Sequence, residues 1–204
     1  MTCEGPIRQR AEIRRRQVAD AARKLFVERG FHNTGMAQIA DASCVKVGQI
    51  YRDFSCKEAI VAAIVEEQFG SFLDTDALRD AIARGDRVEV RAALARFFDY
   101  SPAARMMPEI LAEAARNVRI ADVIRSLDAR LEATVRAALI VFAPGERFER
   151  RRDDVAQVLM TLAIGLCQRN SHAAAPVDES IADILRGHVA REIDALEAAA
   201  ADPA

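Results

Sequence analysis

The chain contains no tryptophan and two tyrosines, and aromatic side chains make up only 5% of its 204 residues. Sheets favour aromatic and β-branched residues, whereas this sequence is rich in Ala, Leu, Arg and Glu, which favour helices. Apolar residues still account for 51% of the chain, enough to build a core. The composition therefore predicts an all-α protein.

Long apolar runs are also missing from the sequence. No stretch approaches the roughly 18 apolar residues that a membrane-spanning helix needs. The N-terminal sequence MTCEGPIRQRAEIRRRQ lacks the apolar segment of a signal peptide. We therefore expect a soluble, cytoplasmic protein that has no membrane partner.

The sequence has little of what catalysis or metal binding requires. The histidines have no metal-ligand spacing, no glycine-rich phosphate loop is present, and the cysteines form no C-x-x-C pair. These residues are His32, His172, His188, Cys3, Cys44, Cys56 and Cys167. We expect no enzyme activity, no catalytic residue, no metal site and no cofactor.

Charge is distributed unevenly along the chain. Residues 1–58 carry 11 Lys and Arg against 7 Asp and Glu, whereas the remainder carries 18 against 24. A basic segment joined to an acidic one is the distribution expected of a nucleic-acid-binding domain on a larger body. A solvated charged surface gives the same totals, so this alternative stays open.

The first part of the chain is organised as short helices joined by tight turns. Residues 14–29 carry an apolar stripe with the period of an amphipathic helix, and Gly30 ends it. Two short helices follow at 36–42 and 47–54. This arrangement predicts a helix-turn-helix DNA-binding domain at residues 8–55.

The rest of the chain continues as helices, for a total of about nine or ten. Ser55 and Glu58 have the S-x-x-E spacing of a capping box, which would begin a long helix ending near residue 73. Further helices are predicted at 75–84, 87–100, 103–116, 119–142, 153–171 and 178–199. Residues 56–204 would form a helical domain that binds an effector and dimerises.

The order of residues in the helix-turn-helix resembles the N-terminal motif of the tetracycline-repressor (TetR) family. The resemblance covers about 45 residues. The residues that match the motif are Arg14-Arg15-Arg16, Ala21-Ala22, Leu25-Phe26, Gly30-Phe31, Thr34, Ile39-Ala40, Val45, Gly48-Gln49-Ile50-Tyr51, Phe54 and Lys57-Glu58. It implies a homodimer that binds a palindromic double-stranded DNA operator, responds to a small-molecule effector and, as in most relatives, acts as a repressor.

The resemblance also implies which residues meet DNA. Gln49 can pair with adenine through two hydrogen bonds, Gly48 would let the helix approach the DNA backbone, and Tyr51 would meet a phosphate or base edge. The expected DNA-binding set is Arg14, Arg15, Arg16, Thr34, Lys46, Val47, Gly48, Gln49, Tyr51, Arg52 and Lys57. For the arginine run, a purely solvated surface is the alternative.

Four positions depart from the family pattern. Cys44 replaces a turn glycine, so either a positive φ there costs about 1 kcal/mol or the turn takes another shape. Gly35 and Lys46 replace helix-capping Ser or Thr and would cap more weakly. Asp53 replaces a Tyr or His that touches the DNA backbone; because a carboxylate repels phosphate, we do not assign that contact to Asp53.

The last two helices carry apolar residues on more than one side. In the family that this chain resembles, two such helices pair across a dimer, and Gly165 would let their backbones approach. The predicted interface consists of Val155, Leu159, Leu162, Leu166, Ile181, Leu185, Val189 and Ile193. The alternative is an ordinary monomeric core.

Flexible apolar and aromatic residues in the middle of the chain suggest a pocket for a largely apolar effector, with Arg116 or Glu109 to anchor a polar group. The predicted ligand-binding set is Phe69, Phe72, Phe97, Phe98, Tyr100, Met106, Met107, Arg116 and Met160. The same residues could simply fill a core.

Two other functions remain open from the sequence. Cys44 and Cys56 lie beside Lys46 and Lys57, which could lower their thiol pKa values and make DNA binding redox-controlled. A helical adaptor that binds only protein is the second alternative.

Overall fold

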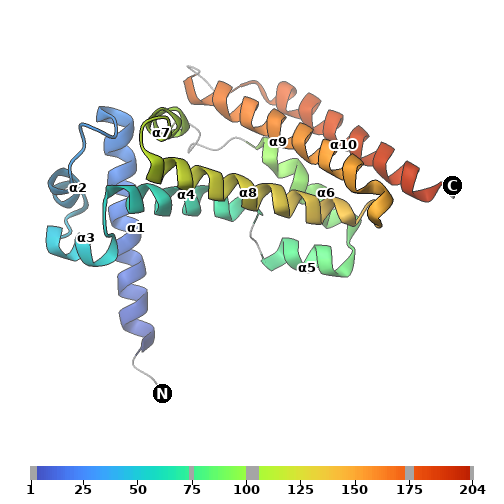
Figure 1. Ribbon diagram of the computed structural model, residues 1–204. Helices are drawn as coiled ribbons and strands as arrows, with labels where there is room; N and C mark the ends of the chain where they lie inside the picture. The colour runs from blue at the N-terminus through green and yellow to red at the C-terminus, as the bar shows by residue number, and fades with distance from the viewer. Residues whose placement is uncertain (1–3, 74–75, 100–105, 173–176, 203–204) are drawn as a thin grey trace. The chain divides into compact units, whose positions relative to one another are not determined.

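The computed structural model describes residues 4–73, 76–99, 106–172 and 177–202. Within these ranges the chain forms ten α-helices and two short 3-10 helices, with no strand (Figure 1). The all-α prediction is confirmed, with the helix count at its upper value.

The first helix, α1 (Glu4–Arg29), begins ten residues before the predicted start at residue 14. Its N-terminal part has no apolar stripe, so the periodicity argument missed it. This part nevertheless consists largely of Arg, Gln, Glu and Ala, which favour helices, and its proline lies in the first turn, where proline is tolerated. Intrinsic propensity accounts for the extension.

The next two helices, α2 (Met36–Ser43) and α3 (Val47–Asp53), lie within one residue of their predicted bounds. Gly35 supplies no side-chain cap to α2, but its amide donates to Oε1 of Gln38 at 2.7 Å. The side chain at the third helical position therefore stabilises a helix start that the sequence predicted to be weakly capped.

The fourth helix, α4 (Lys57–Leu73), starts two residues after Ser55. The predicted capping box is wrong, because Ser55 and Cys56 form a bend and the Glu58 carboxylate accepts a hydrogen bond from Nδ2 of Asn117 at 3.1 Å instead. A partner distant in the sequence has replaced the local one.

The remaining helices agree with prediction in number and differ at their ends. They are α5 (Asp76–Arg84), α6 (Arg87–Ala95), η1 (Arg96–Phe98), α7 (Met107–Ala114), α8 (Val118–Ile140), η3 (Glu146–Phe148), α9 (Glu149–His172) and α10 (Glu179–Ala201). The predicted helix 87–100 ends early as a 3-10 turn. Asp178 caps α10 by accepting from the amide of Ser180 at 2.8 Å.

The chain divides into two compact units that do not follow sequence order. The head unit comprises Met1–Gln68 and Met106–Arg125; the body unit comprises Phe69–Arg105 and Ser126–Ala204. The head unit thus includes α7 and the start of α8 in addition to the first three helices. The functional boundary after residue 55 stays a prediction, because these units are defined by packing.

The core of the head unit forms where α2 and α3 pack against α1 (Figure 1). The predicted stripe of α1 is buried, as are the residues that face it from the other two helices. These residues are Val18, Ala22, Leu25, Phe26, Ile39, Ile50 and Phe54. Apolar burial therefore fixes α3 against α1 by one side only.

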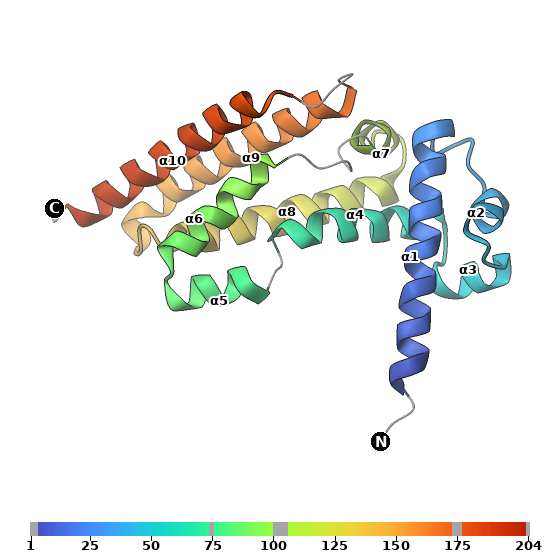
Figure 2. The same cartoon turned by 180° about the vertical axis from the view of Figure 1, so that it is seen from behind.

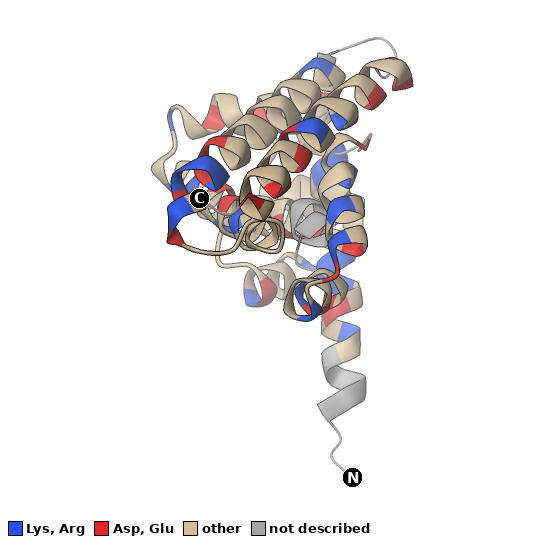
Figure 3. Ribbon diagram, turned by 90° about the vertical axis from the view of Figure 1, so that its right-hand side faces the viewer, with Lys and Arg blue, Asp and Glu red and all other residues tan. Residues whose placement is uncertain are grey.

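The body unit has its own apolar core. Buried residues from α5, α6, α8, α9 and α10 form one cluster that includes Phe98, Leu139, Phe142, Leu159 and Ile193. The helices α9 and α10 run side by side in both views (Figures 1 and 2). Acidic and basic residues are interspersed along the helices (Figure 3). Among the described residues, no helix is apolar over a length that could cross a membrane.

Candidate nucleic-acid interface

The helix α3 presents one side to solvent. Ile50 and Phe54 are fully buried, whereas Tyr51 is 53% exposed and Val47 and Arg52 are exposed as well. A Cβ atom added at Gly48 would meet nothing within 4 Å, so the surface around this glycine is open. The helix α3 therefore has a core-facing side and an outward side.

Lys46 and Gln49 complete this outward surface. Lys46 is the exposed N-cap residue of α3, with no side-chain cap hydrogen bond, and Gln49 is half-buried. Arg52 folds back so that its Nε donates to the carbonyl of Gly48 at 3.3 Å. The outward side therefore combines cations, an amide and a phenol, which are groups that bind phosphates and base edges.

The turn between α2 and α3 keeps the backbone that a glycine would favour. Cys44 has a φ of 55°, so of the two outcomes that the sequence left open, the structure shows the positive φ. Its amide donates to the carbonyl of Asp41, and the amide of Val45 donates to the carbonyl of Ala40 at 3.2 Å. The cysteine thus takes the left-handed conformation, and the turn is preserved at a cost of about 1 kcal/mol.

Two residues of the predicted DNA-binding set hold the turn before α2 instead. Thr34 is fully buried, and its hydroxyl donates to the carbonyl of Gly30 at 2.9 Å. Lys57 donates from Nζ to the carbonyls of Phe31 and Thr34. Their polar groups are committed inside the protein, so we remove both from the DNA-binding set and assign them a structural role.

Lys57 also lies over an aromatic ring. Its Nζ is 3.9 Å from the centroid of the Phe31 ring, a cation–π geometry. Burial lowers the pKa of this ammonium group, while the nearby carboxylates of Glu58 and Glu113 oppose that shift. The motif predicts a lysine here, but its partners depend on how the turn packs on α4.

The carboxylate of Asp53 is held by an arginine of α1. Arg14 donates from Nε to Oδ2 at 2.6 Å and from Nη2 to Oδ1 at 2.9 Å, a two-point pair that joins α1 to the end of α3. The hydrogen bond from Arg14 holds the pKa of Asp53 below its usual value, and Asp53 raises that of Arg14. The sequence indicated that a carboxylate at position 53 departs from the family motif. It did not indicate which cation pairs with that carboxylate.

The other two residues of the arginine run have different partners. Arg15 donates to the backbone carbonyl of Asp53, and its guanidinium lies 4.3 Å from the centroid of the Phe54 ring. Arg16 is largely exposed and pairs with Glu67 through Nε at 3.2 Å. The run is therefore a set of contacts to α3 and α4 as well as a positive surface.

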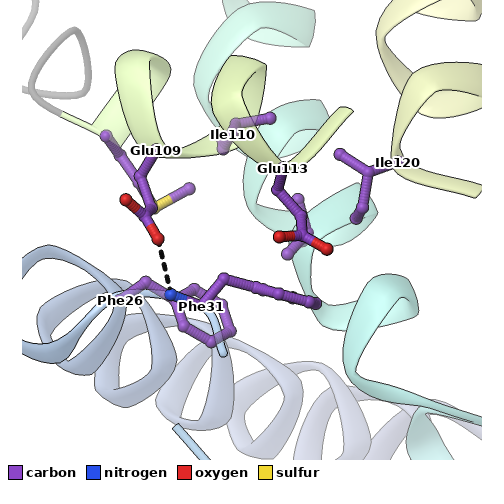
Figure 4. A pocket seen from close by; sticks show the side chains of 8 residues that line it. Phe26, Phe31, Glu109, Ile110, Glu113 and Ile120 are labelled. Atoms are coloured by element: carbon purple, nitrogen blue, oxygen red, sulfur yellow. Dashed lines mark hydrogen bonds between the residues drawn. The ribbon is translucent and has the colours of Figure 1, made fainter. Parts of the chain in front are cut away.

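A small pocket in the head unit contains two carboxylates (Figure 4). Glu109 accepts a hydrogen bond from the amide of Phe31 at 2.7 Å. Glu113 is only 3% exposed; its Oε2 lies 2.7 Å from Nε2 of His32, although the angle is not that of a hydrogen bond. The pocket has room for about one water molecule. The hydrogen bond of Glu109 joins α7 to the turn before α2.

The predicted ligand-binding residues are divided between the two units. Phe98 and Met160 are buried in the body core, and Phe97 packs against it. Met106, Met107 and the exposed Arg116 belong to the head unit, and Met106 lines the small pocket there. Tyr100 and the side chains of Phe69 and Phe72 lie outside the described residues, so this set remains a prediction.

Five of the eight predicted interface residues face the protein's own interior. Val155, Leu159, Leu166, Val189 and Ile193 are buried in the body core, Leu162 and Leu185 are half-buried, and Ile181 is exposed. The apolar residues that do face outward are Val158, Ile164, Ile181 and Ile184. A helix that is apolar on two sides does not reveal from its sequence which side meets its own core.

The three described cysteines are free thiols. Cys44 is exposed, while Cys56 and Cys167 are half-buried. Burial raises the pKa of Cys167, which makes it a poor thiolate former.

Comparison with known proteins agrees with this geometry. Residues 18–64 match the family described as bacterial regulatory proteins, tetR family. The chain is 34% identical over 89 residues to the HTH-type transcriptional activator FasR of Mycolicibacterium smegmatis, covering 43% of this chain and 40% of that protein. It is 36% identical over 55 residues to the HTH-type transcriptional regulator UidR of Escherichia coli, covering 27% and 28%. These matches span less than half of each relative.

Solved structures extend the similarity to almost the whole chain. GusR of Salmonella enterica superposes with a TM-score of 0.61 at 22% identity, over 95% of this chain and 98% of that one. A TetR transcription regulator of Haloarcula marismortui gives 0.64 at 16% identity, over 90% and 98%. At these identities the likeness establishes the fold. Residues 18–64 therefore carry the motif of the tetR family of bacterial regulatory proteins, and the rest of the chain shares the fold of these solved structures.

Proposed function

We propose that the protein is a transcriptional repressor: a homodimer that binds a palindromic DNA operator through α3 and is released by a small-molecule effector. The observation that carries the proposal is the asymmetry of α3. Ile50 and Phe54 fix this helix in the core, while Val47, Tyr51 and Arg52 are exposed beside an open surface at Gly48. A helix held by one side and polar on the other is suited to enter a major groove.

Each exposed group has a role in this proposal. The Gln49 amide can both accept from and donate to adenine, which is direct recognition of a base. Lys46 and Arg52 would neutralise phosphates, and the Tyr51 hydroxyl would donate to a phosphate oxygen. Because phosphate contacts position and base contacts specify, sequence preference should depend chiefly on Gln49.

Dimerisation is supported by apolar side chains that the body unit leaves uncovered. Ile164 is 52% exposed on α9 and Ile184 is 63% exposed on α10, and these helices run side by side (Figure 2). A Cβ at Gly165 would meet nothing within 4 Å, which leaves room for a neighbouring backbone. Exposed apolar residues on neighbouring helices indicate an interface. A two-fold axis at this surface would bring α9 and α10 of two copies of the chain together.

The effector site is proposed near the aromatic residues of η1, Phe97 and Phe98. Phe97 is half-buried and packs beside the body core, so its ring has a partly open side. The helix α4 contributes residues to both units: Lys57 holds the turn of the head unit, and residues beyond Gln68 belong to the body unit. A ligand that displaces α4 would therefore alter the position of the DNA-reading helix.

Selection of genomic fragments by the purified protein, followed by footprinting, tests DNA binding. Gln49→Ala should relax base preference and weaken specific binding by about 1 to 3 kcal/mol, because the paired hydrogen bonds are lost. Arg52→Ala should weaken binding to every sequence equally, because it removes a phosphate contact. If wild-type protein retains no fragment, or if both variants bind as wild type does, the proposed role of α3 is wrong.

A reporter gene placed behind the selected operator tests the direction of regulation. Since FasR is named an activator, repression is supported only by the resemblance to a family in which most members repress. Deleting the regulator should raise transcription. A fall in transcription would make the protein an activator.

A thermal-shift screen tests the effector, since a compound that binds the folded state raises the melting temperature. Phe97→Ala should remove the shift without changing operator affinity. By linkage, ligand should weaken DNA binding by about 5- to 150-fold and DNA should weaken ligand binding equally. Release by mild peroxide instead, abolished in a Cys44→Ser, Cys56→Ser variant, would identify a redox regulator.

A further inference from the structure

If α3 reads DNA as proposed above, its last residue has a role of its own. We propose that Asp53 withholds Arg14 from the DNA backbone and thereby limits the affinity of the protein for duplex DNA of any sequence. The Asp53 carboxylate binds the Arg14 guanidinium in the way that a phosphate would.

The geometry of the pair leaves Arg14 little freedom. Both carboxylate oxygens of Asp53 are used, with Arg14 Nε at 2.6 Å from Oδ2 and Nη2 at 2.9 Å from Oδ1. The Asp53 side chain is 11% exposed and that of Arg14 is 29% exposed. A guanidinium binds carboxylate and phosphate through the same planar pair of N–H groups, so one ligand excludes the other.

Asp53 lies among three arginines. Arg14 and Arg15 approach it from α1, and Arg52 precedes it on α3; all three favour its charged form. The cluster therefore carries three positive charges and one negative charge. Removing the carboxylate would leave three cations at the edge of a helix that is exposed toward DNA.

The pair is not the only contact that holds α1 against α3. Val18 of α1 and Ile50 of α3 are fully buried, and Phe54 is buried directly after Asp53. Apolar burial therefore helps to position α3 independently of the charged pair.

Withholding one cation acts on the sequence-independent part of binding. Affinity for any duplex depends on how many phosphates the protein neutralises, and each contact adds about 0.9 to the slope of log affinity against log salt. Specific binding also draws on base contacts made by α3, which Asp53 does not touch. One arginine fewer therefore lowers the affinity for cognate and non-cognate DNA by a similar factor.

The isosteric variant Asp53→Asn tests the proposal on the full-length protein with a non-cognate duplex of defined length, titrated across salt concentrations. We expect the salt slope to steepen by about 0.9, and binding at 0.1 M salt to tighten about tenfold, because Arg14 becomes available. The ratio of cognate to non-cognate affinity should stay near the wild-type value, because a phosphate contact does not depend on sequence.

Arg14 supplies the second arm of the test. Arg14→Gln in the wild-type background should leave the slope unchanged, because Arg14 contributes no phosphate contact there. The same substitution in the Asp53→Asn background should lower the slope by about 0.9. This dependence of one substitution on the other distinguishes withholding from a simple change in net charge.

Asp41→Asn is the matched control. Asp41 is an exposed carboxylate on α2 of the same unit, and no ion pair joins it within the described part of the chain. Its removal changes the net charge by the same amount without releasing an arginine, so the slope should stay at the wild-type value. Thermal melts of every variant confirm that the fold is intact.

Two results would overturn the inference. A wild-type slope in Asp53→Asn, or weaker binding with an unchanged melt, would mean that Asp53 orients α3 rather than restraining Arg14. Either result leaves the proposed function standing, because wild type still binds DNA. Failure of wild-type protein to bind any duplex would instead overturn the proposed function.

Discussion

The head unit and the body unit differ in what their long-range polar contacts hold. In the head unit these contacts fix the helix-turn-helix: Arg14 holds Asp53 at the end of α3, while Lys57 and Glu109 hold the turn before α2. In the body unit, Arg91 and Arg186 donate to the carbonyls of Ala190 and Phe98 and pair with acidic residues around a large apolar cluster.

This difference agrees with where sequence similarity to the family is found. The family match lies at residues 18–64, within the head unit, whereas the body resembles solved structures by fold at 22% identity or less among those described above. A polar contact requires particular donors and acceptors at defined positions, but an apolar core accepts many side chains of similar volume. The body can therefore vary its residues and keep its helices.

The largest expected effects on stability come from truncating a buried aromatic side chain in each of the two cores. Phe54→Ala in the head unit and Phe98→Ala in the body unit should each lower the free energy of unfolding by about 3 to 5 kcal/mol, because both side chains are fully buried. Calorimetry checks whether the units melt together. If each variant lowers a different transition, the units unfold independently; a loss below about 1 kcal/mol would contradict the assigned cores.

Ile184→Glu tests the proposed dimer interface of the body unit. A charge at this exposed position should not disturb the body core but should prevent dimerisation, so affinity for a two-fold operator should fall about 100-fold or more. Light scattering measures the oligomeric state and gel retardation the affinity. Val88→Glu on α6 is the control, since Val88 is 79% exposed and lies outside α9 and α10. A monomeric wild type at micromolar concentration would contradict the dimer.

Lys57→Met tests the polar contacts of the head unit. The substitution keeps much of the side-chain volume but removes the donor that Phe31 and Thr34 share, so stability should fall by about 1 to 3 kcal/mol. Lys24→Met, at an exposed position of α1, should stay within about 0.5 kcal/mol of wild type. Urea denaturation measures both. Equal effects would show that Lys57 is an ordinary surface residue.

The smallest effect concerns pH. Arg14 holds the folded-state pKa of Asp53 below its ordinary 3.8, so the pair stabilises the protein above that value, and the contribution is lost as pH falls through the lower folded pKa. Wild type should exceed Asp53→Asn in stability by at most about 1 kcal/mol at neutral pH, and the two curves should converge below pH 3.8. A gap that persists or widens in acid would contradict this.

Several features followed from the sequence because their physical causes are local. Helix propensity and the scarcity of aromatic residues indicated an all-α chain, and apolar periodicity and turn residues placed α2 and α3 to within one residue. Each of these depends on neighbours a few residues apart.

Other features were decided only by tertiary structure, because their partners lie far apart in the chain. Arg14 and Asp53 are 39 positions apart, and no local rule selects Arg14 over the two arginines that follow it. The sequence likewise could not tell that Leu159 faces the protein's own core while Ile184 faces outward, since periodicity marks apolar sides without naming what covers them. Thr34 and Lys57 were assigned to DNA for the same reason: a polar residue in a DNA-binding motif can satisfy its hydrogen bonds inside the protein, and only the packed turn shows which acceptors are within its reach.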